Sequence, residues 1–254
     1  MAEFVYDATD KRSVNTLIGR VYGRMFFNLI LTAVIAIGMG LIFNLWIFGT
    51  LSISSDLGNI DSINGTGLTT LLILLIVSAI ALFIMSFVVH LRGFRGKSLT
   101  VPTFIYCALM GILLSTLVMF VPWPVLGITF AITAGIFGIM FLISYISKGS
   151  LNALGMIGFG LLIGAAIISL IGWIFMLTGF LGDYIQLYWI ISLISFAAIM
   201  LITIWDMWRI KKIAEEGAMS DNIVLYCAFI LYVDFIYIFL RVLRFVLYFM
   251  SRRN

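Results

Sequence analysis

Two aspartates stand inside stretches of the chain that are otherwise apolar. The sequence holds 11 acidic residues, and all but two lie in tails or in the connections between apolar runs. The exceptions, Asp206 and Asp234, lie within or at the edge of such runs. An ionised aspartate in the middle of a membrane-spanning helix costs about 2.5–3.5 kcal/mol on insertion scales. Such residues usually face the protein interior and mark a functional path, although a purely structural pairing with an arginine stays open.

The order of the runs favours a pairing of these two carboxyl groups. They lie on consecutive runs, so their helices are antiparallel, and a hairpin centred on Ser220 would place positions 206 and 234 opposite each other. Equal depth in the membrane then requires the last helix to start outside the bilayer, or the loop before it to dip in. Two carboxyl groups that meet in a low-dielectric site cannot both ionise easily, so they share a proton.

Several basic side chains could act as counter-ions to this pair. Arg209 follows Asp206 by three residues. Arg241 follows Asp234 by seven residues on nearly the same helical face, about 10 Å away along the axis, which is too far for direct contact in an ideal helix. The candidate counter-ions are His90, Arg92, Arg209, Arg241 and Arg244.

The sequence lacks the residues and motifs that most other chemistries require. The single histidine, His90, excludes a multi-histidine metal site within the chain, and neither a GxSxG nor an HExxH motif occurs. Cys107 and Cys227 lie inside apolar runs and are expected to be small buried hydrophobic residues. We therefore expect no enzyme activity and no cofactor.

The composition places the elements that carry these residues in a membrane. Of 254 residues, 63% are hydrophobic and 10% are charged, whereas soluble domains carry roughly 25% charged residues. The net charge of +4 comes from bases at the ends of apolar runs, which argues against nucleic-acid binding. The N-terminal segment lacks the short apolar core of a cleaved signal peptide, so the first run is expected to be retained.

Seven runs are long enough to cross a bilayer as helices. They cover about 25–48, 68–90, 101–121, 125–147, 151–178, 187–208 and 223–249. The connections between them are too short to hold a soluble domain. The sequence therefore predicts an all-α integral membrane protein, with residues 1–254 as a single seven-helix transmembrane domain and residues 1–24 as a cytoplasmic N-terminal segment.

The basic residues orient this bundle. Of the 15 Lys and Arg, 11 fall on the side of the N-terminus and none in the connections on the other side. This asymmetry predicts a cytoplasmic N-terminus. The other four bases do not decide on which side of the membrane the C-terminus lies: Arg241, Arg244, Arg252 and Arg253. Short loops suggest a bacterial plasma membrane, with an internal eukaryotic membrane as the alternative.

Small residues recur four positions apart, a spacing that lets helices pack closely. The pairs are Ala36 with Gly40, Ala134 with Gly138, and Gly160 with Gly164.

The last third of the chain resembles the transmembrane Bax-inhibitor-motif family. Its C-terminal signature is similar to "WDMWRIKKIAEEG" followed by "YCAFILYVDFIYIFLRVLRF". "RVYGRMFFNLILTAVIA" and "FAITAGIFGIMFLISYISKGSL" extend the resemblance over most of the chain. It is specific in the first, fourth, sixth and seventh runs. The matching signature residues are Tyr232, Asp234, Phe235, Phe239, Leu243 and Arg244.

This resemblance implies a seven-helix bundle with the last helix in the centre, wrapped by the other six. It also implies a pH-sensitive calcium leak in which Asp206 and Asp234 form the pH sensor, and protonation of the pair favours the open path. Calcium would be the permeant ion, touching these carboxyl groups only transiently. A base at the end of the second span, here Arg92 or His90, would help to hold the closed state.

The chain departs from the family pattern at three places. No acidic residue lies between Thr69 and Val89, where some relatives carry a glutamate. Tyr237 and Arg241 stand where the family often has Asn. The spacing between the two aspartates is also a few residues longer than in compact relatives.

Three functions are compatible with these patterns. The first is a proton-gated leak for calcium or other cations. The second is a proton-coupled transporter, and the third is a non-conducting membrane protein that acts through protein partners, which the sequence does not identify. In each case the chain would meet the lipid bilayer, as a monomer or a weak oligomer.

Overall fold

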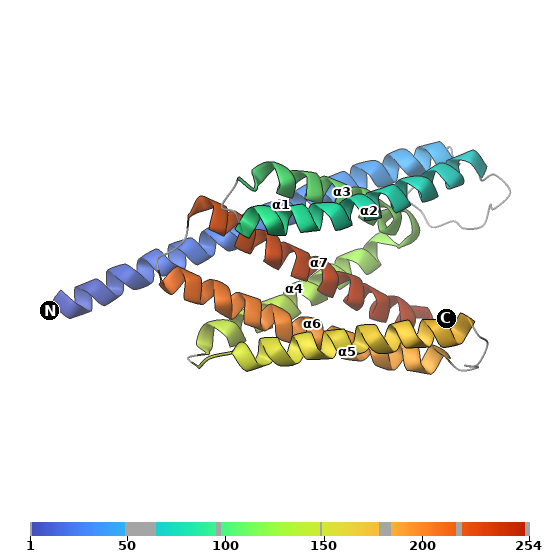
Figure 1. The fold of residues 1–254 in the computed structure, drawn as a ribbon. Coiled ribbons are helices and arrows are strands. Elements are labelled where there is room, and N and C mark those ends of the chain that lie inside the picture. The colour runs from blue at the N-terminus through green and yellow to red at the C-terminus, as the bar shows by residue number, and fades with distance from the viewer. Residues whose placement is uncertain are drawn as a thin grey trace. The chain divides into compact units, whose positions relative to one another are not determined.

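The computed structural model describes residues 2–48, 65–94, 98–147, 149–177, 184–216 and 220–251. Over these residues the chain forms seven α-helices and no strands (Figure 1). The all-α prediction is therefore confirmed. The helices are α1 (Ala2–Phe48), α2 (Gly65–Phe94), α3 (Thr100–Phe120), α4 (Trp123–Ile146), α5 (Asn152–Leu177), α6 (Tyr184–Glu215) and α7 (Asp221–Ser251).

Each of the seven helices is long and apolar enough to cross a membrane. Two of them extend well beyond the predicted runs. Helix α1 begins at Ala2 rather than near residue 25, and α6 continues through the basic stretch to Glu215. Lys, Arg, Glu and Ala favour helical backbone, and neither stretch contains a proline, so the helices continue past the apolar runs. Three of the 11 bases used for orientation lie outside the described residues: Arg95, Lys97 and Lys148. Arg252 and Arg253, two of the other four, also lie outside them.

Proline and serine mark several helix boundaries. Pro122 separates α3 from α4, and its carbonyl oxygen accepts the first hydrogen bonds of α4, from the N–H groups of Val125 (3.0 Å) and Leu126 (3.2 Å). Pro102 lies in the first turn of α3, where a missing N–H is tolerated. The Ser220 hydroxyl accepts a hydrogen bond from the Ile223 N–H at 3.4 Å, at the start of α7.

The helices form two compact units. The first comprises residues 1–129 and 218–232, and the second comprises 130–217 and 233–254, so α4 and α7 contribute to both. In the first unit α3 packs against α1 and α2, and in the second α5 packs against α6. The single-domain organisation and the central position of the last helix stay predictions.

Glycines permit the closest helix contacts inside each unit. In the first unit, a Cβ on Gly111 of α3 would lie 2.8 Å from Ile35, and one on Gly40 of α1 would lie 3.1 Å from Val118. In the second unit, a Cβ on Gly158 of α5 would lie 2.8 Å from Ile202. Backbones that approach this closely are typical of helix packing in membranes.

The small-residue spacing located only some of these contacts. The prediction is confirmed for Gly40, but a Cβ on Gly138, Gly160 or Gly164 would meet no described atom within 4 Å. The packing glycines of α5 are instead Gly155 and Gly158. Spacing shows which glycines share a helix face, but it does not show which face meets a neighbouring helix.

Candidate functional site

The two intramembrane aspartates lie near each other in the second unit. Asp206 of α6 is buried, with 8% of its surface exposed. Its carboxyl group lies close enough to interact electrostatically with that of Asp234 of α7. The structure thus brings together the two carboxyl groups that the sequence suggested as a pair.

Thr203 of α6, which the sequence analysis did not single out, faces the Asp234 carboxyl group. Its side chain is fully buried and forms a side-chain hydrogen bond with Asp234. Asp206 follows Thr203 by three residues, or about 4.5 Å along the helix axis. Thr203 and Asp206 therefore lie about one helical turn apart on α6, and both interact with Asp234. The sequence feature that could have identified Thr203 is a hydroxyl residue one helical turn from an intramembrane acid.

The polar atoms around Asp234 are incompletely satisfied. Its Oδ2 is shielded from solvent and has no hydrogen-bond partner among the described residues. The Thr203 hydroxyl donates to the Ile199 carbonyl oxygen at 2.9 Å. A hydroxyl has one hydrogen to donate, so the Thr203 hydroxyl can donate fully to Ile199 or to Asp234 but not to both at once.

Of the predicted counter-ions, Arg209 is the one that the structure brings to Asp206. Its positive charge interacts with the Asp206 carboxyl group. Its guanidinium carbon lies 5.4 Å from the centre of the Trp205 ring, so the side chain is also oriented by a cation–π contact. Arg209 is exposed, whereas Asp206 is buried, and the interaction therefore runs from the surface of the unit inward.

Arg241 and Arg244 lie elsewhere in the second unit. Arg241 Nη1 donates to the Ser192 hydroxyl oxygen at 2.9 Å and is 3.5 Å from the Ser192 carbonyl oxygen. Both arginines line a cavity of about 440 Å³ between α5, α6 and α7. The cavity follows α6 from Ile191 to Ile199 and includes Tyr237 of α7, which lies within electrostatic reach of Asp234, so its inner end approaches the acid pair.

His90 and Arg92 belong to the first unit. His90 Nδ1 is 2.9 Å from the Ser86 carbonyl oxygen. Its ring meets those of Tyr226 and Phe229 edge-on, with centroids 5.8 Å and 6.4 Å away. Arg92 is exposed in the last turn of α2. Because the aspartates belong to the second unit, a counter-ion role for His90 or Arg92 stays a prediction.

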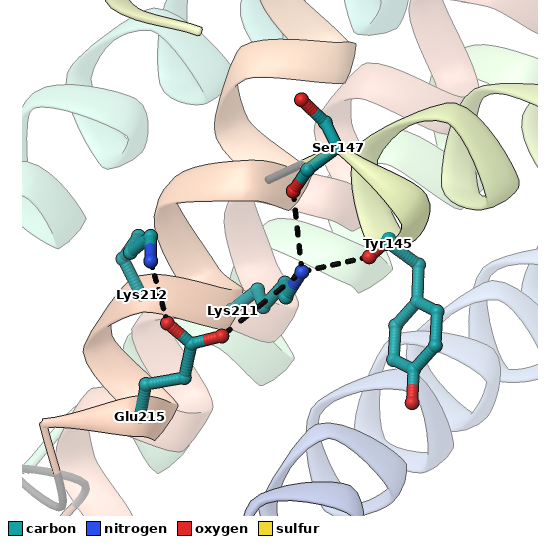
Figure 2. A network of polar contacts seen from close by, with 5 residues as sticks. All are labelled: Tyr145, Ser147, Lys211, Lys212 and Glu215. Atoms are coloured by element: carbon teal, nitrogen blue, oxygen red, sulfur yellow. Dashed lines mark hydrogen bonds and ion pairs between the residues drawn. The ribbon is translucent and has the colours of Figure 1, made fainter. Parts of the chain in front are cut away.

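A polar network ties the end of α6 nearest Asp206 to the end of α4 (Figure 2). Lys211 Nζ donates to the carbonyl oxygens of Tyr145 (2.7 Å) and Ser147 (3.4 Å) and lies 4.0 Å from Glu215 Oε1. Glu215 Oε2 also accepts from Lys212 at 2.7 Å. The carbonyl groups at a helix C-terminus need donors and attract cations, so Lys211 caps α4. The sequence indicated these lysines only as markers of orientation.

A second buried polar cluster lies in the first unit. The Thr32 and Tyr232 hydroxyl oxygens are 2.7 Å apart, and the Thr32 hydroxyl also reaches the carbonyl oxygens of Asn28 (2.9 Å) and Cys107 (3.4 Å). Cys107 and Cys227 are both buried, as the sequence predicted, and both are free thiols. The cluster joins α1 and α3 to Tyr232, the α7 residue of this unit that lies closest in sequence to Asp234.

The acid pair offers few ligands for a resident cation. Within the described parts of the chain, no three His, Cys, Asp or Glu residues come together as a metal site. Calcium takes six to eight oxygen ligands at about 2.3–2.6 Å. Asp206 and Asp234, with the Thr203 hydroxyl, supply only part of such a shell, and water would supply the rest. The arrangement suits passing contact with a cation better than permanent binding.

Seven helices long and apolar enough to cross a membrane define a multi-pass integral membrane protein, and the carboxyl pair lies within two of these helices. The chain belongs to the Bax inhibitor family, because the family model described as "Inhibitor of apoptosis-promoting Bax1" matches residues 14–254. The family that the sequence resembled is thus confirmed.

Several bacterial proteins are similar to this chain. Inner membrane protein YbhL of Escherichia coli (strain K12) is 28% identical over 239 residues, which cover 92% of each chain. Uncharacterized protein YrjE of Lactococcus lactis is 28% identical over 244 residues, again 92% of each chain. Uncharacterized protein RP147 of Rickettsia prowazekii is 31% identical over 145 residues, 56% of this chain and 58% of its own. No solved structure matches the chain significantly.

Proposed function

We propose that this protein is a proton-gated leak for calcium and other cations, and that Asp206 and Asp234 form its gate. The observation that carries the proposal is the approach of two carboxyl groups from adjoining helices inside the membrane-spanning part of one unit. Charged groups at such depth are costly and usually serve ion or proton movement. Membership of the Bax inhibitor family supports the same function.

The proposed gate works through the protons that the pair holds. With one shared proton, one carboxyl group donates to the other, and the remaining negative charge attracts Arg209. This arrangement latches α7 to α6. A second proton removes the negative charge, so the charge-assisted hydrogen bond between the carboxyl groups becomes a weaker neutral one and the attraction to Arg209 is lost. Acidification thus weakens the latch and shifts the population toward the open form.

A permeating cation would meet the same two side chains. Negative oxygens attract calcium, and the small number of ligands lets it leave again, as conduction requires. The proposed activity is transport rather than catalysis, with calcium as cargo and protons as the signal. The chain would act in the inner membrane of a bacterium, where the name of the Escherichia coli relative places that protein.

The test is calcium flux into liposomes that contain the purified protein, measured between about pH 6 and about pH 8, where such a gate would operate. We expect flux to rise on acidification. Asparagine imitates a protonated aspartate, so Asp206→Asn and Asp234→Asn should raise flux at the alkaline end and flatten the pH dependence. Asp221→Asn is the matched control, because its side chain is 82% exposed beside Arg20 and should leave the profile unchanged.

Two results would count against the proposal. An unaltered pH profile in both aspartate variants would show that Asp206 and Asp234 do not form the gate. Proton movement coupled to another solute, without calcium flux, would indicate the proton-coupled transporter instead.

A further inference from the structure

The cavity lined by Arg241 and Arg244 has no part in the proposed gate. It has a volume of about 440 Å³ and lies wholly within the second unit. Its walls combine two arginines of α7 with hydroxyl groups from all three helices, Ser169 of α5, Ser192 of α6 and Tyr237 of α7 among them. No acidic side chain is among the described residues that line it. Two basic side chains and several hydroxyl groups thus line a cavity whose other lining residues are apolar.

The position of this charge is unusual in the chain. The cavity follows the first half of α6, from Ile191 to Ile199, away from Lys211 at the other end of that helix. The connection before α6, 178–183, contains no Lys or Arg. Two bases of α7 nevertheless converge on this cavity, which indicates a local role rather than membrane orientation.

The guanidinium of Arg241 is held in place. Its Nη1 donates to the Ser192 hydroxyl oxygen at 2.9 Å, and the same nitrogen is 3.5 Å from the Ser192 carbonyl oxygen. A guanidinium presents a planar fork of N–H donors that matches the paired oxygens of a phosphate group. Because Ser192 fixes Arg241, little side-chain freedom is left to lose when an anion binds.

The surroundings of the cavity indicate what carries the anion. Arg244 is exposed, and the three helices that line the cavity carry exposed apolar side chains, including Leu162 (37%), Leu193 (61%) and Leu247 (37%). On membrane-spanning helices such surfaces face the acyl chains of lipids. A ligand with a phosphate head and hydrocarbon tails could contact both the arginines of the cavity and the exposed apolar side chains.

We propose that this cavity is a binding site for a phosphate group, presented by the headgroup of an anionic phospholipid. Arg241, fixed by Ser192, is the main anion contact. Arg244 adds a second charge at the mouth of the cavity, and the tails lie along the apolar surface of α5 and α7. This site uses neither aspartate as a ligand, and among its lining residues Tyr237 is the one that lies within electrostatic reach of Asp234.

The experiment is native mass spectrometry of the full-length protein in detergent, with phosphatidylglycerol and phosphatidylcholine supplied in equal amounts. We expect retention of phosphatidylglycerol to exceed that of phosphatidylcholine about tenfold, as one charge-assisted interaction provides. The double substitution Arg241→Gln with Arg244→Gln should remove the preference, and Ser192→Ala should reduce it. Lys212→Gln is the control, because it removes an exposed positive charge at the opposite end of α6.

A second arm distinguishes the source of the phosphate. Inorganic phosphate is added in excess, and the thermal stability of the native chain and of the double variant is measured. Stabilisation of the native chain alone, without lipid preference, would support the anion site but replace the lipid by a free oxyanion. The proposal is overturned if neither lipid nor phosphate distinguishes the native chain from a double variant that remains folded.

Discussion

At the scale of single residues, the two aspartates of the acid pair have different neighbours, and these neighbours affect how each carboxyl group holds a proton. Asp206 has a cation, Arg209, within electrostatic reach, while Asp234 has Thr203 and an Oδ2 without a described partner. A cation favours the ionised form of a carboxyl group, and burial without a donor disfavours it. The two aspartates are therefore not equivalent, and Arg209 is the side chain best placed to set the proton affinity of the pair.

Arg209→Gln tests this assignment. The substitution removes the positive charge near Asp206 and makes proton uptake easier, so half-maximal calcium flux should occur at higher pH. A shift of about one pH unit corresponds to about 1.4 kcal/mol. Arg209→Lys keeps the charge and should leave the midpoint nearly in place. Equal midpoints for the native chain and the Gln variant in the liposome assay would show that Arg209 does not tune the pair.

At the scale of helices, the end of α6 is held by its contact with α4. Lys211 lies five residues beyond Asp206 and satisfies carbonyl oxygens at the C-terminal end of α4 (Figure 2). Its side chain is 18% exposed, whereas that of Lys212 is 43% exposed and bonds only to Glu215 among the described residues. The two adjacent lysines therefore differ in their structural roles, although they are equivalent in a count of positive charges.

Lys211→Met keeps the length of the side chain and removes the cap. Hydrogen bonds from a charged donor are worth about 1.5–3 kcal/mol, so a clear loss of thermal stability in detergent is expected. Lys212→Met, the matched control, loses an exposed ion pair worth about 0–1 kcal/mol and should unfold nearly like the native chain. Equal destabilisation by both substitutions would contradict a capping role for Lys211.

At the scale of the whole molecule, hydropathy predicted seven helices and their approximate centres, because a bilayer requires about 20 consecutive apolar residues. The isolated acids within those runs predicted the candidate site. Helix ends outside the apolar runs, such as the start of α1 at Ala2, follow from local propensity and gave no hydropathy signal. Contacts such as Thr203 with Asp234 or Gly158 with Ile202 depend on the rotation of one helix against another, which a single sequence does not encode visibly.

The topology gives a final prediction about the two ends of the chain. Helix α7 contains 31 residues, which span about 46 Å and exceed the roughly 30 Å hydrocarbon core. Seven complete crossings would put the termini on opposite sides, and the 11 bases on the N-terminal side predict that this end is cytoplasmic. A fluorescent protein fused at the N-terminus should therefore fluoresce, and alkaline phosphatase fused after Asn254 should be active in the periplasm. Inactive phosphatase, together with fluorescence when the reporter is moved to the C-terminus, would mean that α7 turns back, and Arg241 and Arg244 would then lie on the cytoplasmic side.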